Sequence, residues 1–307
     1  MIRGRADNYG PVSIRLEMLQ VARLAPKLLG DATDLVRGFL QSQQNQDGGF
    51  RDRTGQSDLY YTVFGLNSFP ALGDDFEGLR YDPGTFVRSF GRGEELDVVH
   101  LCCLARAWAA LSREKFPTAD VDALLGHIEK FRSGDGGYAN ESGRPFGSVY
   151  GCFLAWGAYQ DLGRSMPNAL GVVQCLKLLE TKEGAWVNDR LVRVGSVPAT
   201  AAAVTLLRQL GMPVNESVGQ WLLERAHAQG GFCAVPGAPV PDLLSTATAL
   251  HALAGLQVPF KPIQESCLDF IDSLWTNEGA FHGHWEDDIL DCEYTFYGLL
   301  ALGHLSL

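Results

Sequence analysis

The sequence predicts an all-α fold, a closed α/α toroid of six inner and six outer helices, and three observations support it. A glycine-rich turn ending in an aromatic residue recurs at intervals of roughly 40 to 50 residues, the length of a helix pair. A capped, apolar segment follows each turn. The segments between are amphipathic with the 3.6-residue helical period, and no stretch alternates as a strand would.

The turns come first in each repeat. Five are well preserved, and a weaker copy lies around Phe90. The aromatic residues of the five are Phe50, Tyr138, Trp186, Phe232 and Phe281. Each follows two small residues, so we expect these rings to wedge between helices of the outer layer and to have a structural role.

The inner helices follow the turns. Their first residues are Asp58, Asp97, Ser148, Ser196, Asp242 and Asp291. Asp and Ser are favoured at this position because the side-chain oxygen accepts a hydrogen bond from a free N–H of the first turn. The helices that they begin are apolar on nearly all sides, which predicts burial.

Amphipathic segments predict the outer layer, for example those beginning at Asp31, Val121, Val218 and Glu265. An open stack of such helix pairs would need polar caps at both ends, and neither end of the chain provides one. A closed ring removes this need. We therefore expect one repeat domain over residues 31–307, after an N-terminal extension with a leading helix over residues 1–30.

Composition narrows the function classes. The chain has 307 residues, of which 46% are hydrophobic, and a formal net charge of −11 without clustered Lys or Arg, which argues against nucleic acid as a partner. No run of about 18 apolar residues predicts a membrane span, and the first residues lack the apolar stretch of a signal peptide. Most of the seven cysteines fall inside expected helices, which favours a reducing compartment. We expect a cytoplasmic protein.

The repeated turn and capped helix resemble the repeat of protein prenyltransferase β subunits and of terpene and squalene cyclases. GGFCAVPGAPVPDLLST around Asp242 and EDDILDCEYTFYGLLALG around Asp291 look most like a geranylgeranyl-transferase type β subunit. The resemblance implies a cavity for an isoprenoid diphosphate and a zinc ion that activates a cysteine thiolate of an acceptor protein.

The family's zinc ligands fall on Asp242, Leu244 and Tyr294. Leucine has no donor atom, and tyrosine is a rare substitute for imidazole. The loop 235–241 also lacks the cations that hold the diphosphate in that family. We therefore predict no cofactor, and zinc binding would require altered ligands.

The segment from Asp291 to Thr295, DCEYT, resembles the D-x-D-D-T signature of acid-initiated terpene cyclases, with Glu293 in the central place. The resemblance implies that an apolar cavity raises the pKa of this acid until it can protonate an alkene. A capping Asp with a nearby Glu is also ordinary helix chemistry. The candidate catalytic residues are Glu293, Asp291, Asp242 and His100, which the helical register places near the mouth, the end at which the inner helices begin.

Large aromatic residues on some inner helices face small residues on others, which predicts a lopsided apolar cavity suited to a long hydrocarbon. The candidate substrate-binding residues are Tyr61, Trp108, Tyr150, Trp156, Tyr294 and Tyr297. The same large side chains could instead fill the space. We expect the polar end of any ligand near His100, Asp242 and Glu293.

These observations favour a prenyltransferase-like or terpenoid-cyclase-like toroid that binds a polyprenyl or terpenoid substrate without zinc-dependent protein prenylation. The alternative is a non-catalytic scaffold that binds a helical partner protein, as β subunits bind α subunits. A carbohydrate-active toroid with two carboxylates is a weaker third reading, because the acids here gather at helix caps.

Overall fold

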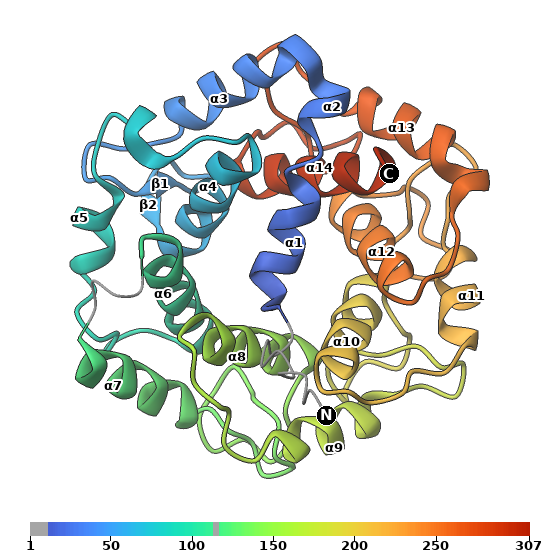
Figure 1. The fold of residues 1–307 in the computed structure, drawn as a ribbon. Helices are drawn as coiled ribbons and strands as arrows, with labels where there is room; N and C mark the ends of the chain where they lie inside the picture. Colours follow the sequence, from blue (N-terminus) through green and yellow to red (C-terminus); the bar gives the residue numbers. More distant parts are fainter. Residues whose placement is uncertain (1–11, 113–116) are drawn as a thin grey trace, which may run out of the picture.

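The computed structural model describes residues 12–112 and 117–307, which form a closed ring of two helical layers (Figure 1). The inner helices are α4 (Leu59–Ala71), α6 (Val98–Ala110), α8 (Val149–Asp161), α10 (Val197–Gln209), α12 (Leu243–Gly255) and α14 (Cys292–Leu305). The outer helices are α3 (Thr33–Ser42), α5 (Pro83–Arg88), α7 (Thr118–Glu129), α9 (Ala169–Leu179), α11 (Ser217–Leu223) and α13 (Gln264–Ser273). The predicted all-α toroid is confirmed.

Every inner helix begins directly after the residue that the sequence identifies as its cap. The Asp242 Oδ1 atom accepts a hydrogen bond from the Ser245 N–H at 2.7 Å, and Asp291 Oδ1 accepts one from the Tyr294 N–H at 2.9 Å. Such caps fix the first turn of each helix at the same end of the ring. That end is the mouth.

The aromatic residues of the turns contact both layers: Phe50 and Phe281 pack onto inner helices, and the Trp186 Nε1–H donates to the Leu176 carbonyl of outer helix α9 at 2.9 Å. A Cβ atom added at Gly65 or Gly298 would lie 2.5 Å from the ring of Phe50 or Phe281, respectively. The aromatic ring therefore occupies the place of a missing side chain and joins the turn to the inner helix. This contact explains why both positions carry glycine.

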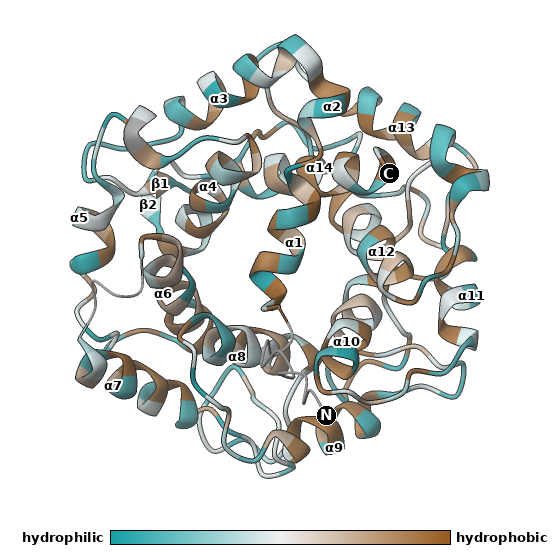
Figure 2. Ribbon diagram, viewed as in Figure 1, coloured by the Kyte–Doolittle hydropathy of each residue, from teal (hydrophilic) through white to brown (hydrophobic). Residues whose placement is uncertain are grey.

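Little of the described chain is strand. The strands β1 (Phe50–Arg51) and β2 (Ser57–Asp58) pair antiparallel, with Phe50 opposite Asp58. Hydrophobic and hydrophilic residues alternate along the outer helices (Figure 2), which is the amphipathic pattern read from the sequence. Within the described ranges, no helix has the length and apolar character needed to cross a membrane.

Helix α1 (Ile14–Ala22) lies inside the ring (Figure 1) and closes the end opposite the mouth. The backbone N–H of Ile14 donates to Gln160 near the end of α8, and Glu17 on α1 pairs with Arg208 near the end of α10 at 3.0 Å. The chain then reaches the outer layer through α2 (Pro26–Leu29). Three short 3₁₀ turns occur in the described chain: Gly30–Ala32, Phe76–Gly78 and Lys261–Ile263.

Candidate functional site

The ring encloses a cavity with two lobes. The α6 lobe has a volume of about 70 Å³ and is lined by Arg15, Phe64, Cys102, Cys103, Arg106 and Phe296, among others. The α12 lobe has a volume of about 260 Å³ and is lined by Pro198, Ala201, Ala202, Leu244, Thr248 and Glu293, among others. Five residues line both lobes, so the two lobes adjoin: Met18, Tyr60, Tyr150, Phe153 and Tyr297.

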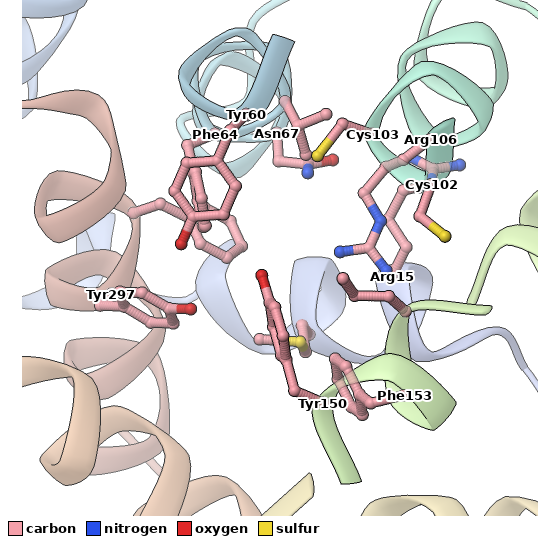
Figure 3. A pocket seen from close by; sticks show the side chains of 14 residues that line it. Arg15, Tyr60, Phe64, Asn67, Cys102, Cys103, Arg106, Tyr150, Phe153 and Tyr297 are labelled. Atoms are coloured by element: carbon pink, nitrogen blue, oxygen red, sulfur yellow. The ribbon is translucent and has the colours of Figure 1, made fainter. Parts of the chain in front are cut away.

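Three tyrosines stand where the lobes meet. The hydroxyl groups of Tyr60, Tyr150 and Tyr297, from three different inner helices, are directed into the same space (Figure 3). Burial raises the pKa of the Tyr60 and Tyr150 hydroxyls, so both are neutral donors at physiological pH. Tyr150 is also 36% exposed, so the site communicates with solvent.

Glu293 places a carboxyl group in this site. It lies in the first turn of α14, its carboxyl group lines the α12 lobe, and its Oε1 atom accepts a hydrogen bond from the Tyr60 hydroxyl at 2.6 Å. Burial raises the pKa of Glu293 to about 7, against the opposing effect of the Tyr60 hydrogen bond. A carboxyl group with this pKa is protonated in a substantial fraction of molecules near neutral pH and can act as a general acid.

Asp291 lies beside Glu293 but is already engaged. It is 2% exposed, caps α14, and forms an ion pair with Arg53 Nε at 2.9 Å. Arg53, from the loop between β1 and β2, also pairs with Asp287 at 2.9 Å. Burial raises the pKa of Asp291, and Arg53 opposes the rise. Sequence reasoning missed Arg53, because a loop arginine before an inner helix has no distinguishing pattern.

The family's zinc positions do not fit a zinc ion here. The two carboxylate oxygens of Asp242 accept hydrogen bonds from the Ser245 N–H and hydroxyl, each at 2.7 Å. Leu244 turns a hydrocarbon side chain into the α12 lobe, and the Tyr294 ring lies 5.3 Å from the Arg53 guanidinium carbon. In the part of the chain that the structure describes, no three His, Cys, Asp or Glu side chains are grouped so as to hold a metal ion.

His100 joins two helix caps. Its Nδ1 lies 2.9 Å from the carboxylate of Asp97, the cap of α6, and its Nε2 lies 3.0 Å from that of Asp58, the cap of α4. These carboxylates raise the pKa of His100 to about 9, so the imidazole is charged at neutral pH. The described residues that line the two lobes do not include His100.

The six candidate substrate-binding residues are not all in the cavity. Tyr150 and Tyr297 line both lobes. Tyr61 and Tyr294 lie near Arg53 and line neither lobe. Trp156 packs against the hydrophobic core.

Trp108, expected to bind substrate, lines neither lobe of the cavity. This side chain lies in an outer groove with Arg88, Arg92 and Pro117. The reason is helical periodicity. Trp108 follows the cavity-lining Arg106 by two residues, or about 200°, which places the two on opposite faces of α6.

Sequence reasoning also missed a buried charge cluster. Asp161, at the end of α8, accepts hydrogen bonds from Arg106 Nε at 3.1 Å and from Arg15 Nε at 3.3 Å. Arg106 offered a signal, since it is a charged residue within an otherwise apolar inner segment. Arg15 offered none, because it precedes the repeats.

The sequence matches the prenyltransferase alpha-alpha toroid domain family over residues 15–79, 72–169 and 174–305. A search among curated proteins gives no match.

Several solved structures share the fold. One is a variant of the type II terpene cyclase MstE from Scytonema in complex with its product merosterolic acid A, with 13% identity, a TM-score of 0.62, and coverage of 95% of this chain and 98% of that one. A second MstE variant, in complex with its substrate geranylgeranyl dihydroxybenzoate, has 12% identity, a TM-score of 0.60 and the same coverage.

Protein geranylgeranyltransferase-I from Candida albicans, complexed with GGPP, has 14% identity, a TM-score of 0.52, and coverage of 95% of this chain and 82% of that one. At these identities the likeness concerns the fold. The match to the family is a match of sequence over most of the chain, and it is independent of the likeness to these solved structures. The chain belongs to the prenyltransferase alpha-alpha toroid domain family.

Proposed function

We propose that this protein binds a polyprenyl or terpenoid molecule in the two lobes and starts its cyclisation by proton transfer from Glu293. The observation that carries the proposal is a carboxyl group with a pKa of about 7 on the wall of an aromatic cavity. General acids work best when their pKa lies near the working pH.

The hydrogen bond from Tyr60 sets the position of the proton. Because the hydroxyl donates to Oε1 of Glu293, the acidic proton resides on Oε2. Its transfer to an alkene carbon forms a C–H bond and leaves a carbocation. A second alkene of the same chain then attacks the cation and closes a ring. The final cation then loses a proton to water, which gives the product, and the Glu293 carboxylate takes up a proton from water, so that no net proton is consumed.

The aromatic wall suits this chemistry. Tyr60, Phe64, Tyr150 and Tyr297 contribute π faces that stabilise a nearby cation by about 0.5 to 2 kcal/mol each. Apolar surroundings also limit capture of the cation by water. Isoprenoid compounds are bound in the MstE and geranylgeranyltransferase structures, which supports the same ligand class for this cavity.

Zinc-dependent protein prenylation is not part of the proposal, because Asp242, Leu244 and Tyr294 do not form a zinc site. Elemental analysis of the purified protein tests this, with less than about 0.1 zinc per chain expected. One zinc per chain, lost in the Asp242→Ala variant, would contradict it.

We also propose a cytoplasmic location, since the seven free cysteines, all buried, suit a reducing compartment.

The decisive experiment compares the wild-type protein with Glu293→Gln in turnover of linear C15 and C20 polyprenyl compounds. We expect the variant to lose turnover by at least about a hundredfold while keeping its affinity. The matched control is Glu286→Gln, at an exposed glutamate of the loop before α14. Full turnover in Glu293→Gln would refute the acid role. Absence of any polyprenyl binding would instead favour the scaffold that binds a helical protein.

A further inference from the structure

We propose that Arg15 and Arg106 form a subsite for a single carboxylate on the ligand, in the α6 lobe and away from Glu293. This inference rests on the proposed function, since the carboxylate is taken to belong to an isoprenoid. It names the ligand class more narrowly, as an isoprenoid carboxylic acid, and it assigns a direction to the bound chain.

Two guanidinium groups share one carboxylate in this cluster. Asp161 has a side chain that is 1% exposed, and it is the carboxylate that pairs with both guanidinium groups. The side chains of Arg15 and Arg106 are only 14% and 17% exposed. Two positive groups therefore share one negative group in a poorly hydrated place. Burying an uncompensated charge is unfavourable, so the cluster favours one additional negative charge.

Both arginines have hydrogen-bond donors that the described residues leave unused. Within the described ranges, each of the two arginines hydrogen-bonds only through its Nε, to Asp161. Their terminal amino groups have no hydrogen-bond acceptor in that part of the chain. Both side chains line the α6 lobe (Figure 3). Paired amino groups of arginine match the two oxygens of a carboxylate.

The charge of the cluster favours a carboxylate over a diphosphate. One surplus positive charge is neutralised by one carboxylate, whereas a diphosphate would bring further negative charges that no group here balances. The rest of the α6 lobe is largely apolar and aromatic, with Met18, Phe64, Phe153 and Phe296 in its wall. An acid on a hydrocarbon chain fits both parts of this surface, and inorganic anions fit only one.

The position of the two arginines sets the direction in which the ligand lies. Asp161 and Arg15 lie at the closed end of the ring, where α8 ends against α1, and Glu293 lies in the first turn of α14 at the mouth. A ligand held by its carboxylate extends past Tyr150 and Tyr297 and brings its alkene end to Glu293. This direction reverses the expectation from sequence, which placed the polar end near His100, Asp242 and Glu293.

The experiment measures affinities of the full chain for geranylgeranoic acid, geranylgeraniol and geranylgeranyl diphosphate by calorimetry at pH 7.5. We expect the acid to bind at least about tenfold more tightly than the alcohol and than the diphosphate. The alcohol cannot form charge-assisted hydrogen bonds to the two guanidinium groups as an anion does, and the diphosphate brings more negative charge than the single surplus positive charge neutralises. Equal binding of acid and alcohol would overturn the subsite and leave the proposed function standing. Binding of none would overturn both.

Variants separate charge from packing. Arg15→Gln leaves the Arg106–Asp161 pair neutral and intact, so it should fold and lose the preference for the acid without losing affinity for the alcohol. Asp161→Asn should increase the preference, because it removes the competing carboxylate. Arg208→Gln is the control, since Arg208 pairs with Glu17 of α1 and lines neither lobe. An unchanged preference in Arg15→Gln, or an equal loss in Arg208→Gln, would overturn the subsite.

Discussion

The two lobes of the cavity differ in volume and in charge. The α12 lobe, about 260 Å³, owes its space to small side chains on α10 and α12, such as Ala201, Ala202 and Thr248. The α6 lobe, about 70 Å³, is filled by large aromatic side chains and two arginines. The backbone of the inner helices repeats around the ring, so the difference arises from their side chains and from helix α1, which supplies Arg15 to the α6 lobe.

This contrast shows how one repeat supports two local environments. The caps and turns that build each helix pair are similar in all repeats, and they lie away from the cavity wall. Positions that face the cavity are free to differ. The α12 lobe provides room for a hydrocarbon chain and contains Glu293 in its wall, and the α6 lobe provides aromatic side chains and positive charge. Function in such a fold resides in these positions and not in the repeat.

The largest effect on stability is expected at Glu293. Its pKa is about 7 in the folded protein and 4.5 in the reference state, a difference that corresponds to about 3 kcal/mol at about 1.4 kcal/mol per unit. Because the folded state binds this proton more tightly, stability should fall as pH rises from about 4.5 to about 7. Glu293→Gln should therefore be more stable than wild type at pH 8, by up to that amount, and similar to it at pH 4.

Denaturant unfolding at both pH values measures this difference. Glu286→Gln, at an exposed position, keeps Glu293 and should therefore lose stability with rising pH as the wild type does. If wild type and Glu293→Gln lost stability equally between pH 4.5 and pH 7, the pKa of Glu293 would not be raised in the folded protein. The α12 lobe would then lack the proposed general acid.

Filling the α12 lobe should weaken ligand binding. Ala202→Phe places a ring where the hydrocarbon is expected, and the lost apolar contact should reduce affinity for geranylgeraniol by about thirtyfold, or about 2 kcal/mol. Fluorescence titration measures the change. Ala119→Phe, on the exposed face of outer helix α7, is the control. Undiminished affinity in Ala202→Phe would place the ligand outside this lobe.

Much of the ring was predictable from sequence, and the cavity only in part. The turns and caps were readable because they recur with local patterns, and Glu293, Tyr150 and Tyr297 followed from their distance to a cap. Helix α1 was not placed, because it lies outside the repeats and no register applies to it. The contact of Arg15 with Asp161 joins residues 146 positions apart, which no local pattern reveals. Trp108 was misplaced although the helical period alone puts it opposite Arg106.

His100 tests the mouth of the ring, where it joins the caps of α4 and α6. Its pKa of about 9 exceeds the usual 6.5, so its contribution should be present below pH 6.5 and lost as pH rises towards 9. The side chain is 32% exposed, so solvent screening reduces the expected effect of His100→Gln to about 1 kcal/mol at pH 6. Thermal unfolding at pH 6 and pH 9.5 measures it, with His127→Gln on outer helix α7 as the control. A loss of the same size at both pH values would mean that the charge of His100 is not what joins the caps.

The last prediction concerns the hydrogen bond to Glu293 from Tyr60, which lines both lobes. This bond lowers the pKa of Glu293, so Tyr60→Phe should raise that pKa, by about one unit. The pH above which turnover declines should then move upward by the same amount, because the acid keeps its proton to higher pH. Tyr61→Phe is the matched control, since the carboxyl group of Glu293 accepts its hydrogen bond from Tyr60. A downward shift in Tyr60→Phe would show that the hydroxyl stabilises the protonated acid, and an equal shift in Tyr61→Phe would show that the effect is not specific to this bond.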